Sequence, residues 1–384
     1  MKYIFTILFV LFFAGCSNTM NTPSSIGHSN SFLEVDVVAQ QDLSNDSDVS
    51  VALTPNQNDQ KSIDTLEQQK PLAIQTIEQT NKNSFGILFA SKVILKYSNE
   101  LINTLNNYAI YKESNISLYT FDGVFETKEA LQKQINLIHD ANITKVIALL
   151  TKESLQDLDF FDDTIYYFPL VHKNEIPFDT QQNLYFGAID YKQQTIELLA
   201  TIGEEKFIEF YDDSALGNML HSYVQNHPNL IYSKPIDDNN RNYKDFIQNN
   251  KQLENSVLLL NTPIVKSSIL LSQLNAYKKH PKLILSSQLN YTSLIISLTQ
   301  YEDRKNLFIA NSIAYLEPEL LEYLDFNAVN VVYRWVNYAT IVGFEYLINQ
   351  DISQFKELKI EQNQIIYPIK FYKISQNSIE IFNK

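Results

Sequence analysis

The sequence predicts an α/β protein with two Rossmann-like lobes, each built on a parallel sheet, and a cleft between the lobes. Segments typical of strands and helices alternate along the chain, and a second alternating run begins after Tyr185–Asp190. Continuous apolar runs such as Val146–Leu150 are typical of strands that a parallel sheet buries on both faces. Repeated strand–helix–strand units place helices on both faces of such a sheet. Two runs joined by a short crossing therefore predict two lobes rather than one unbroken sheet.

The first lobe is predicted at about residues 84–184, with a return segment at about 315–348. After its opening strand, Ile94, Tyr97 and Leu101 recur at steps of three and four, which indicates an amphipathic helix. The strands expected in this lobe are Phe85–Ala90, Ile116–Phe121, Val146–Leu150 and Thr164–Val171.

The second lobe is predicted at about residues 190–312, where a new set of strands is separated by helices. A long helix is then expected from Asn330 to Ile348. The segments Ile365–Tyr372 and Ser378–Phe382 alternate like a hairpin around the turn-forming pair Gln376-Asn377. The strands expected in the second lobe are Lys206–Tyr211, Leu230–Ser233, Val257–Leu260, Leu283–Ser286 and Leu307–Ala310.

The N-terminal residues 1–15 are predicted to be a signal peptide, because the apolar run Tyr3–Phe12 is too short to span a membrane. The small residues before Cys16 resemble the processing site of bacterial lipoproteins, which implies that Cys16 carries lipid; an ordinary signal peptide is the alternative. Ser17 resembles the sorting pattern for the outer membrane of Gram-negative bacteria. Residues 16–83 are polar and lack any helical or strand period, so we expect a disordered tether ahead of a folded domain at 84–384.

The composition and the motifs argue against several classes of function. The chain of 384 residues has a formal net charge of −14, whereas nucleic-acid binding needs a basic surface. Neither a GxGxxG nor a GxxxxGK(S/T) pattern occurs, so no nucleotide cofactor is expected. No GxSxG motif occurs and the single cysteine is Cys16, so no catalytic residue is expected. His221 and His227 have a poor spacing for metal ligands, and no metal site is expected.

Polar residues follow most of the predicted strands, and open α/β sheets bind ligands beyond the carboxyl ends of their strands. For Ser214, with Asp212 and Asp213, the alternative is helix capping by short oxygen-bearing side chains. The adjacent carboxylates of Asp212 and Asp213 are expected at a solvated loop end rather than as a catalytic pair. Trp335 is expected in the core, with stacking on a ring ligand as the alternative. The predicted cleft residues are Ser91, Asp122, Thr151, His172, Asp212, Ser214, Thr262 and Gln288.

Several segments have the order and spacing of a known two-lobed fold. Leu184–Asp190 is similar to a strand that crosses between lobes, and Lys206–Gly217 to a strand, an acidic turn and a Tyr-Gly helix start. Val257–Pro263 is similar to the next strand of that lobe, and Asn337–Thr340 to the start of a Tyr-Asp-Ala helix. With these segments, residues 85–384 resemble the type I periplasmic binding protein fold. The resemblance implies a binding protein without catalytic activity.

The departures from that family concern its ligand site. Members that bind amino acids hold the ligand's charged ends with short polar residues after the third and fourth strands and with the tyrosine of Tyr-Gly. This sequence has other residues at those positions, as given next, and they argue against recognition of an amino-acid zwitterion. The positions here hold Thr151–Glu153 and Val171–Lys173, with Leu216 for the tyrosine, Ala339 for the aspartate and Ser91-Lys92 for a glycine-rich loop.

The lipid anchor and the tether give a second resemblance, to the penicillin-binding protein activator lipoproteins of the outer membrane. Those proteins carry a domain of this fold and contact a peptidoglycan synthase. The resemblance implies a regulator of cell-wall synthesis on the periplasmic face of the outer membrane, with a synthase as its partner. The alternative is the substrate-binding lipoprotein of an ABC uptake system for a small polar ligand such as an amino acid.

Overall fold

The computed structural model describes residues 83–112, 115–178, 181–237 and 242–382 and contains two seven-stranded sheets. The prediction of two parallel-stranded lobes is therefore confirmed. The predicted signal peptide, Cys16 and the tether lie outside the described residues. None of the described helices is long and apolar enough to cross a lipid bilayer.

The first sheet is parallel except at one edge, where β11 runs antiparallel to β12. Its strand order is β11 (Lys359–Glu361), β12 (Gln364–Ile366), β5 (Leu184–Phe186), β4 (Ile165–Phe168), β3 (Lys145–Leu149), β1 (Ser84–Phe89) and β2 (Ser117–Asp122). Its helices are α2 (Ser91–Tyr111), α3 (Lys128–Asp140), α4 (Lys152–Leu155), α11 (Pro318–Phe326) and α12 (Trp335–Asn349), with a 3-10 turn η1 (Lys173–Glu175).

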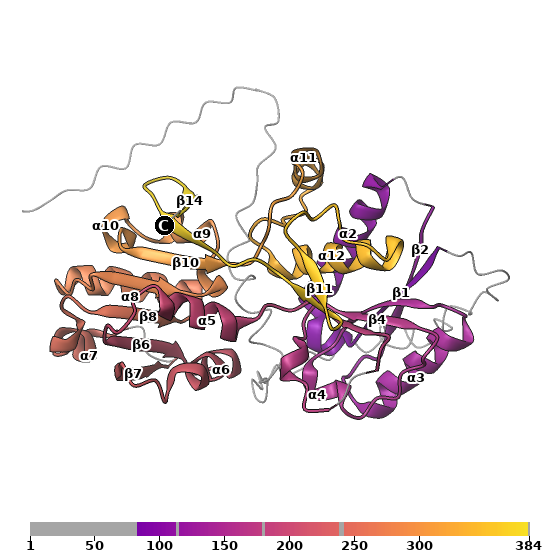
Figure 1. The fold of residues 1–384 in the computed structure, drawn as a ribbon, viewed down its shortest axis with the longest axis horizontal. Helices are drawn as coiled ribbons and strands as arrows, with labels where there is room; N and C mark the ends of the chain where they lie inside the picture. Colours follow the sequence, from indigo (N-terminus) through magenta and orange to yellow (C-terminus); the bar gives the residue numbers. More distant parts are fainter. Residues whose placement is uncertain (1–82, 113–114, 179–180, 238–241, 383–384) are drawn as a thin grey trace, which may run out of the picture. The chain divides into compact units, whose positions relative to one another are not determined.

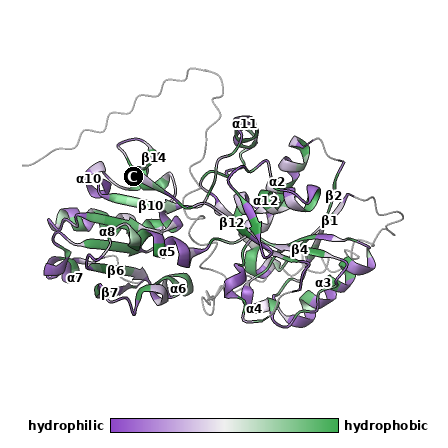
Figure 2. Ribbon diagram, in the orientation of Figure 1, coloured by the Kyte–Doolittle hydropathy of each residue, from purple (hydrophilic) through white to green (hydrophobic). Residues whose placement is uncertain are grey.

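Alternate residues of these strands belong to two different cores. Ile147 and Leu149 of β3 cluster with the apolar residues of α2 and α12, whereas Val146 and Ala148 cluster with those of α3. Figure 1 shows α2 and α12 on one side of the sheet and α3 and α4 on the other. The continuous apolar run at β3 thus reflects burial on both faces, and Figure 2 shows hydrophobic residues concentrated on these strands.

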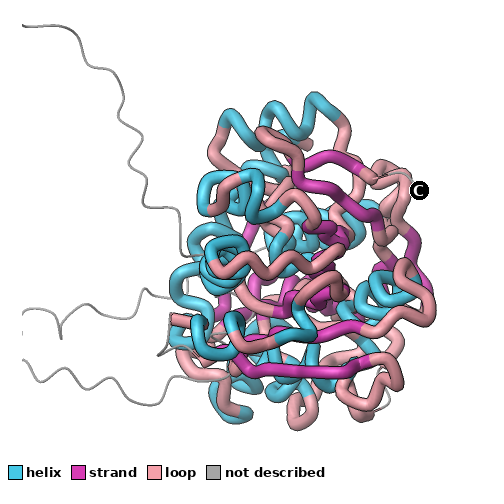
Figure 3. Tube along the Cα trace, turned by 90° about the vertical axis from the view of Figure 1, so that its left-hand side faces the viewer, coloured by secondary structure: helices cyan, strands magenta, loops and turns pink. Residues whose placement is uncertain are grey.

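The second sheet is parallel except for β13 and β14, which form an antiparallel pair beside β10. Figure 3 shows its strands (magenta) among the helices (cyan) of this lobe. Its strand order is β14 (Ile379–Ile381), β13 (Lys370–Ile374), β10 (Leu307–Asn311), β9 (Leu283–Ser286), β8 (Val257–Asn261), β6 (Phe207–Asp212) and β7 (Leu230–Ile236). Its helical segments are α5 (Tyr191–Ala200), α6 (Ala215–Val224), α7 (Lys244–Gln248), η2 (Lys251–Leu253), α8 (Ile264–Ala276), η3 (Gln288–Asn290), α9 (Leu294–Leu298) and α10 (Tyr301–Arg304).

The chain passes between the two sheets three times: after β5, after β10, and between β12 and β13. The third crossing corrects the prediction of one strand at Ile365–Tyr372. Ile365 and Ile366 pair in the first sheet, whereas Lys370 begins the strand of the second sheet. Pro368 lies between the two strands, where a residue without an N–H group interrupts a ladder of hydrogen bonds. The predicted hairpin at the C-terminus is confirmed as β13 and β14.

The helix predicted from Asn330 begins five residues later, at Trp335. Asn330 instead makes a turn in which its side-chain oxygen accepts a hydrogen bond from Tyr333 N (3.0 Å). Its carbonyl oxygen accepts a second bond from the side-chain amide of Asn337 (2.8 Å). Asparagine favours such local turns over helix, so the α12 helix starts only after these bonds are made.

A tyrosine in the first lobe fills a slot between two glycines near the crossings. A Cβ atom at Gly187 or at Gly343 would lie 1.8 Å from the ring or hydroxyl of Tyr167. The Tyr167 hydroxyl donates to the Ala339 carbonyl (2.8 Å), and the Tyr367 hydroxyl donates to the Gly187 carbonyl (2.9 Å). Glycine is required at both positions because the backbone approaches a buried ring closely. These contacts join the first crossing, α12 and the third crossing.

Candidate functional site

Two hollows lie near the carboxyl ends of the strands, where ligands of open α/β sheets bind. The smaller, which we call the aromatic hollow, has a volume of about 60 Å³ and is lined by Tyr97, Glu100, Leu101, Tyr191, Gln288, Leu289, Tyr291, Thr292, Tyr333, Arg334, Trp335, Val336 and Asn337. The larger, which we call the apolar hollow, has a volume of about 140 Å³ and is lined by Thr151, Lys152, Glu153, Leu170, Glu175, Ala188, Ile189, Tyr191, Ala215, Leu216 and Met219. Both hollows contain Tyr191, the first residue of α5.

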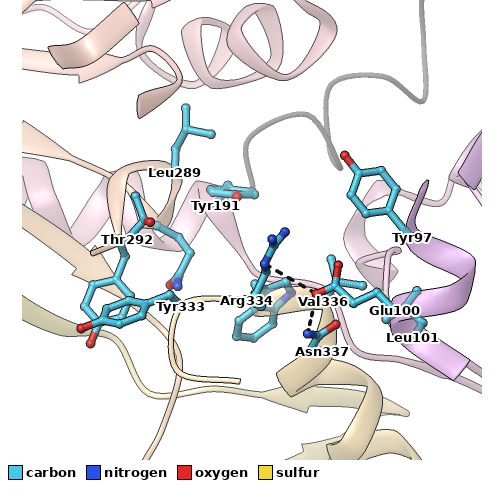
Figure 4. Close-up of a pocket in the computed structure, with 13 residues that line it drawn as sticks. Tyr97, Glu100, Leu101, Tyr191, Leu289, Thr292, Tyr333, Arg334, Val336 and Asn337 are labelled. Carbon is cyan, nitrogen blue, oxygen red and sulfur yellow. Dashed lines mark hydrogen bonds and ion pairs between the residues drawn. The ribbon is translucent and has the colours of Figure 1, made fainter. Parts of the chain in front are cut away.

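The polar groups of the aromatic hollow bind one another. The Glu100 carboxylate accepts a hydrogen bond from the Asn337 side chain (2.8 Å) and lies 3.6 Å from Arg334 Nε. Figure 4 shows the Arg334 side chain between Tyr191 and Tyr97. The charges that line this hollow are thus balanced within the protein.

Trp335 is 7% exposed and its ring packs against those of Tyr338 and Tyr367, at centroid distances of 5.8 and 4.5 Å. This position confirms the prediction that Trp335 belongs to the core. Its indole N–H has no hydrogen-bond partner among the described residues. The Trp335 side chain also lines the aromatic hollow. The many aromatic residues of its helix did not predict that position.

The apolar hollow presents aliphatic groups between the strand ends of the two lobes, with Leu170 and Ile189 among them. Leu216, which stands where the resemblance implies a tyrosine, lines this hollow. At its rim, Lys152 Nζ and Glu175 Oε2 form an ion pair at 3.5 Å. Burial raises the pKa of Glu175 even though Lys152 favours the charged form. Ala339, which stands for the aspartate of the Tyr-Asp-Ala helix, is fully buried in the core.

In the first lobe, two of the predicted cleft residues bond to each other. The Asp122 carboxylate accepts hydrogen bonds from Ser91 N (2.9 Å) and Val124 N (2.7 Å). Burial disfavours the charge of Asp122, but hydrogen bonds from the Ser91 side chain and from the backbone of Ser91 and Val124 outweigh it and hold the Asp122 pKa below its usual value. Ser91 and Asp122 thus join the first turn of α2 to the end of β2.

Thr151 and His172 are also engaged within the first lobe. Glu126 accepts hydrogen bonds from Thr151 N (2.6 Å) and Thr151 Oγ1 (2.9 Å), and burial raises the Glu126 pKa despite them. His172 is 5% exposed, and its Nδ1 accepts a bond from Asn174 N (3.2 Å). Its Nε2 lies 3.7 Å from the Asp190 carboxylate, yet burial lowers the His172 pKa. Of the predicted residues in this lobe, only Thr151 lines either hollow.

In the second lobe, the prediction that Asp212 sits at a solvated loop end is wrong. Asp212 is 1% exposed, and its carboxylate forms an ion pair with Lys266 of α8. The other carboxylate oxygen accepts a hydrogen bond from Ser214 N (2.9 Å). Ser214 caps α6, because its hydroxyl accepts a bond from Gly217 N (3.2 Å). The capping alternative therefore describes Ser214, and the lysine that pairs with Asp212 is 54 residues away.

Thr262 and Gln288 belong to buried hydrogen-bond networks. Thr262 Oγ1 lies 2.8 Å from Ser267 Oγ in the first turn of α8. The Gln288 side chain donates to Asn311 Oδ1 (2.7 Å) and accepts from Ser312 N (2.6 Å), while Gln288 N donates to Gln194 Oε1 (3.0 Å). Gln288 lines the aromatic hollow, whereas Thr262, Asp212 and Ser214 line neither hollow.

The sequence did not reveal the partners that hold these residues. Glu126, Gln194 and Lys266 are each far along the chain from the groups they bind, by 25, 94 and 54 residues. Glu126 lies four residues beyond the end of β2 and Gln194 lies within α5, so neither stands directly at a strand end. The strand ends predicted as a ligand site are thus brought to the correct edge of each sheet, but the structure uses them mainly for internal bonds.

His221, considered above as a metal ligand, has a different partner. Its Nδ1 lies 2.7 Å from the buried Glu209 carboxylate, which also accepts bonds from Ser233 Oγ (2.9 Å) and Asn261 Nδ2 (3.0 Å). The ring of His227 instead contacts that of Phe207 at 5.2 Å. Within the described part of the chain, no group of three His, Cys, Asp or Glu side chains could hold a metal ion.

The paired sheets and the crossings between them have the two-lobed architecture of the type I periplasmic binding protein fold, and comparison with solved structures supports this fold. No family model matches the sequence, and no curated protein matches it either. The chain is similar to the leucine-binding protein LivK of Thermotoga maritima, with a TM-score of 0.55 at 9% identity over 78% of this chain and 97% of that one.

Two further structures show the same fold. The branched-chain amino acid transporter substrate-binding protein LivJ of Streptococcus pneumoniae, in complex with isoleucine, gives a TM-score of 0.53 at 9% identity over 79% of this chain and 99% of that one. LpoA of Haemophilus influenzae gives a TM-score of 0.53 at 12% identity over 80% of this chain. The match spans 60% of the LpoA chain. At these identities the likeness establishes the fold alone.

Proposed function

We propose that this protein is a non-catalytic regulator of the cell envelope that binds a peptidoglycan synthase, as the penicillin-binding protein activators do. The fold is that of a binding module, and it occurs both in LpoA and in carriers of amino acids. The choice between these two functions depends on the polar groups at the strand ends.

The observation that carries the proposal is that these polar groups already have partners. Hydrogen bonds to other protein groups engage Asp122, Thr151 and Gln288. Asp212 forms an ion pair with Lys266, so the charges of both are neutralised. A site for an amino acid needs groups left over for the ligand's two charges, because unpaired charges are costly to bury. The hollows, of about 60 and 140 Å³, are also smaller than the ~300 Å³ at which small-molecule pockets usually begin.

The anchor and the location belong to the same proposal. We infer that Cys16 carries lipid and that the residues after it tether the folded domain to the periplasmic face of the outer membrane. Several acyl chains on one residue anchor a protein firmly. A tether of the length 16–83 reaches on the order of 45 Å as a flexible coil, which suits contact with a large synthase away from the membrane.

Thermal-shift measurements on the chain without residues 1–16 test the proposal. Amino acids, nucleosides and muropeptides are each added in excess, and the melting temperature is recorded. A ligand at 100 times its dissociation constant stabilises a protein by about 2.7 kcal/mol, which a melting curve resolves. We expect no shift with any of them, and we expect in-cell crosslinking of the full chain to capture a peptidoglycan synthase. A clear shift with one solute and no captured synthase would overturn the proposal.

The second candidate is the substrate-binding lipoprotein of an ABC uptake system. It is favoured by the apolar hollow, since Leu170, Ile189 and Leu216 could contact a small aliphatic side chain. Met219→Glu places a charge in that hollow from a half-buried position on α6. If the protein carries an aliphatic amino acid, this variant loses the thermal shift that the unaltered protein shows; if it is a regulator, synthase capture is unchanged.

A further inference from the structure

The two most exposed large hydrophobic residues of the described chain lie on neighbouring helices. Phe326 at the end of α11 is 89% exposed, and Ile110 near the end of α2 is 66% exposed. The helices contact each other through Tyr111 and Tyr323, whose ring centroids lie 5.3 Å apart. Figure 1 shows α11 near α2, and the two helices are in contact. Phe326 and Ile110 thus leave two large apolar side chains in solvent at the ends of two helices that are in contact, and exposed apolar surface of this kind often marks an interaction site.

The α11 helix holds its place without these residues. Its inner side buries Leu320 and Leu324, which are 5% and 0% exposed. Phe326 therefore contributes little to the packing of the helix that carries it. Solvent exposure of such a side chain has no structural benefit to the isolated protein, and this makes it a candidate for a role in binding.

Three carboxylates accompany Phe326 on the exposed side of α11. Glu319, Glu322 and Asp325 follow one another at steps of three, so they form one stripe along the helix. All three residues are exposed, and none has a cation within ion-pair distance in the described structure. Glu317, just before the helix, does have one, since it pairs with Lys356 at 2.7 Å. We call Ile110, Glu319, Glu322, Asp325 and Phe326 the α11 face.

We propose that the α11 face is the docking surface for a protein partner that presents an apolar socket bordered by lysine or arginine side chains. The inference rests on the proposed function, since it names the surface through which a regulator would act. Phe326 would enter the socket as an aromatic anchor, since aromatic residues, phenylalanine among them, are enriched at protein interfaces. The carboxylate stripe would face the basic rim and speed association by electrostatic attraction.

Charge decides among the possible occupants. If a second copy of the chain bound here, the carboxylate stripe would face either the same stripe or another surface of a protein with a net charge of −14. Like charges that face each other across an interface disfavour binding. Residues 17–83 of the same chain carry nine acidic and three basic residues, so they are a poor match as well. A partner with a basic surface is the occupant that complements the face.

Photocrosslinking in cells that make the full chain tests the surface directly. A photoreactive amino acid replaces Phe326 in one strain and Ile196 in another, because Ile196 is a 50% exposed residue of α5 outside the α11 face. We expect an adduct with one partner protein from position 326 and none from position 196, and mass spectrometry identifies the partner. No adduct from 326, equal adducts from both positions, or an adduct with the chain itself would overturn the docking surface.

The identity of the partner separates this inference from the proposed function. A synthase crosslinked at 326 supports both. A different protein with a basic contact surface supports the docking surface and overturns the synthase proposal. A synthase captured by a general crosslinker but not from position 326 overturns the docking surface alone.

Binding measurements with the purified partner then test the chemistry of the contact. We expect Phe326→Ser to weaken binding by about tenfold or more, whereas Ile196→Ser leaves it unchanged. We expect the triple variant Glu319→Gln, Glu322→Gln, Asp325→Asn to slow association and to reduce its dependence on salt concentration. Binding of both α11 variants within twofold of the unaltered protein would overturn the proposal.

Discussion

The strand ends and the α11 face both carry acidic side chains, but the two regions use them differently. At the strand ends, Asp212 is buried against Lys266, and Asp122 accepts two backbone hydrogen bonds. On the α11 face, Glu319 and Glu322 are exposed and have no cation nearby in the described structure. Carboxylate side chains therefore stabilise the fold at the strand ends, whereas on the α11 face they remain available to a partner.

This contrast separates two properties of a polar side chain: its place at a strand end, and whether its hydrogen-bonding groups are already engaged. A polar residue at a strand end is evidence for a ligand site only when its hydrogen-bonding capacity is not already used. Gln288, for example, has the right position but bonds to Gln194, Asn311 and Ser312. Position in the fold and availability of the side chain are separate questions.

The largest expected effect is the loss of the buried cation of the second lobe. Replacing Lys266 with methionine removes the cation that neutralises the buried Asp212 carboxylate, and we expect the free energy of unfolding to fall by about 3–5 kcal/mol in urea titrations. The matched control is Lys305→Met, which breaks the exposed ion pair with Glu302 and should have no measurable effect. Equal effects of the two variants would contradict a structural role for the Asp212 pair.

A smaller loss is expected for the amide network behind Gln288. Gln194 is fully buried, accepts a bond from Gln288 N and donates one to Ser312 Oγ (2.7 Å). Gln194→Leu leaves both partners unbonded, and we expect a loss of about 1–3 kcal/mol in unfolding free energy. Gln193→Leu, at the exposed neighbouring position, is the control and should leave stability near that of the unaltered protein. A neutral result for Gln194→Leu would mean that the network has room to rearrange.

The next effect is a pH dependence in the first lobe. Burial lowers the pKa of His172 in the folded protein, so the unfolded chain takes up a proton at a higher pH than the folded chain does. His172 therefore contributes stability above its unfolded pKa of about 6.5, and this contribution falls as the pH drops through 6.5 toward the folded value. Melting temperatures of the protein and of His172→Asn, measured from pH 7.5 to 5.5, should converge as the pH falls. Parallel curves would show that His172 does not titrate differently in the two states.

The smallest expected effect on stability is at the α11 face. Neutralising Glu319, Glu322 and Asp325 together removes three charges that hold no other described group in place. We expect the melting temperature to stay the same or to rise slightly, since like charges on one stripe repel each other. A clear loss of stability would mean that these carboxylates support the fold and would remove the contrast with the strand ends.

Much of the fold could be predicted because its signals are local. The apolar run at Val146–Leu150 corresponds to β3, and the amphipathic pattern after Phe89 corresponds to α2. The third crossing was missed because Ile365–Tyr372 has one continuous strand pattern, while the partners of its two halves lie in different sheets. Pro368 was the only local sign of the break.

The candidate site was predicted less well than the fold. Strand-end positions were found correctly, since the carboxyl ends of parallel strands follow from the strand boundaries. Whether Thr151 is available to a ligand depends on Glu126, which approaches it from the loop before α3. That contact joins two loops that are far apart along the chain, and no local sequence pattern predicts how close they lie in the fold.

The two alternating sets of strands and helices can be predicted from the chain's local pattern, because hydrophobic period and turn residues act over a few neighbouring positions. That Lys266 pairs with Asp212 and that Gln194 bonds to Gln288 follows from the folded structure alone. It alone also showed that the side chains of Phe326 and Ile110 stay in solvent. Whether a charge is paired or a side chain is exposed depends on residues that are distant along the chain. These residues come close to one another only when the chain folds.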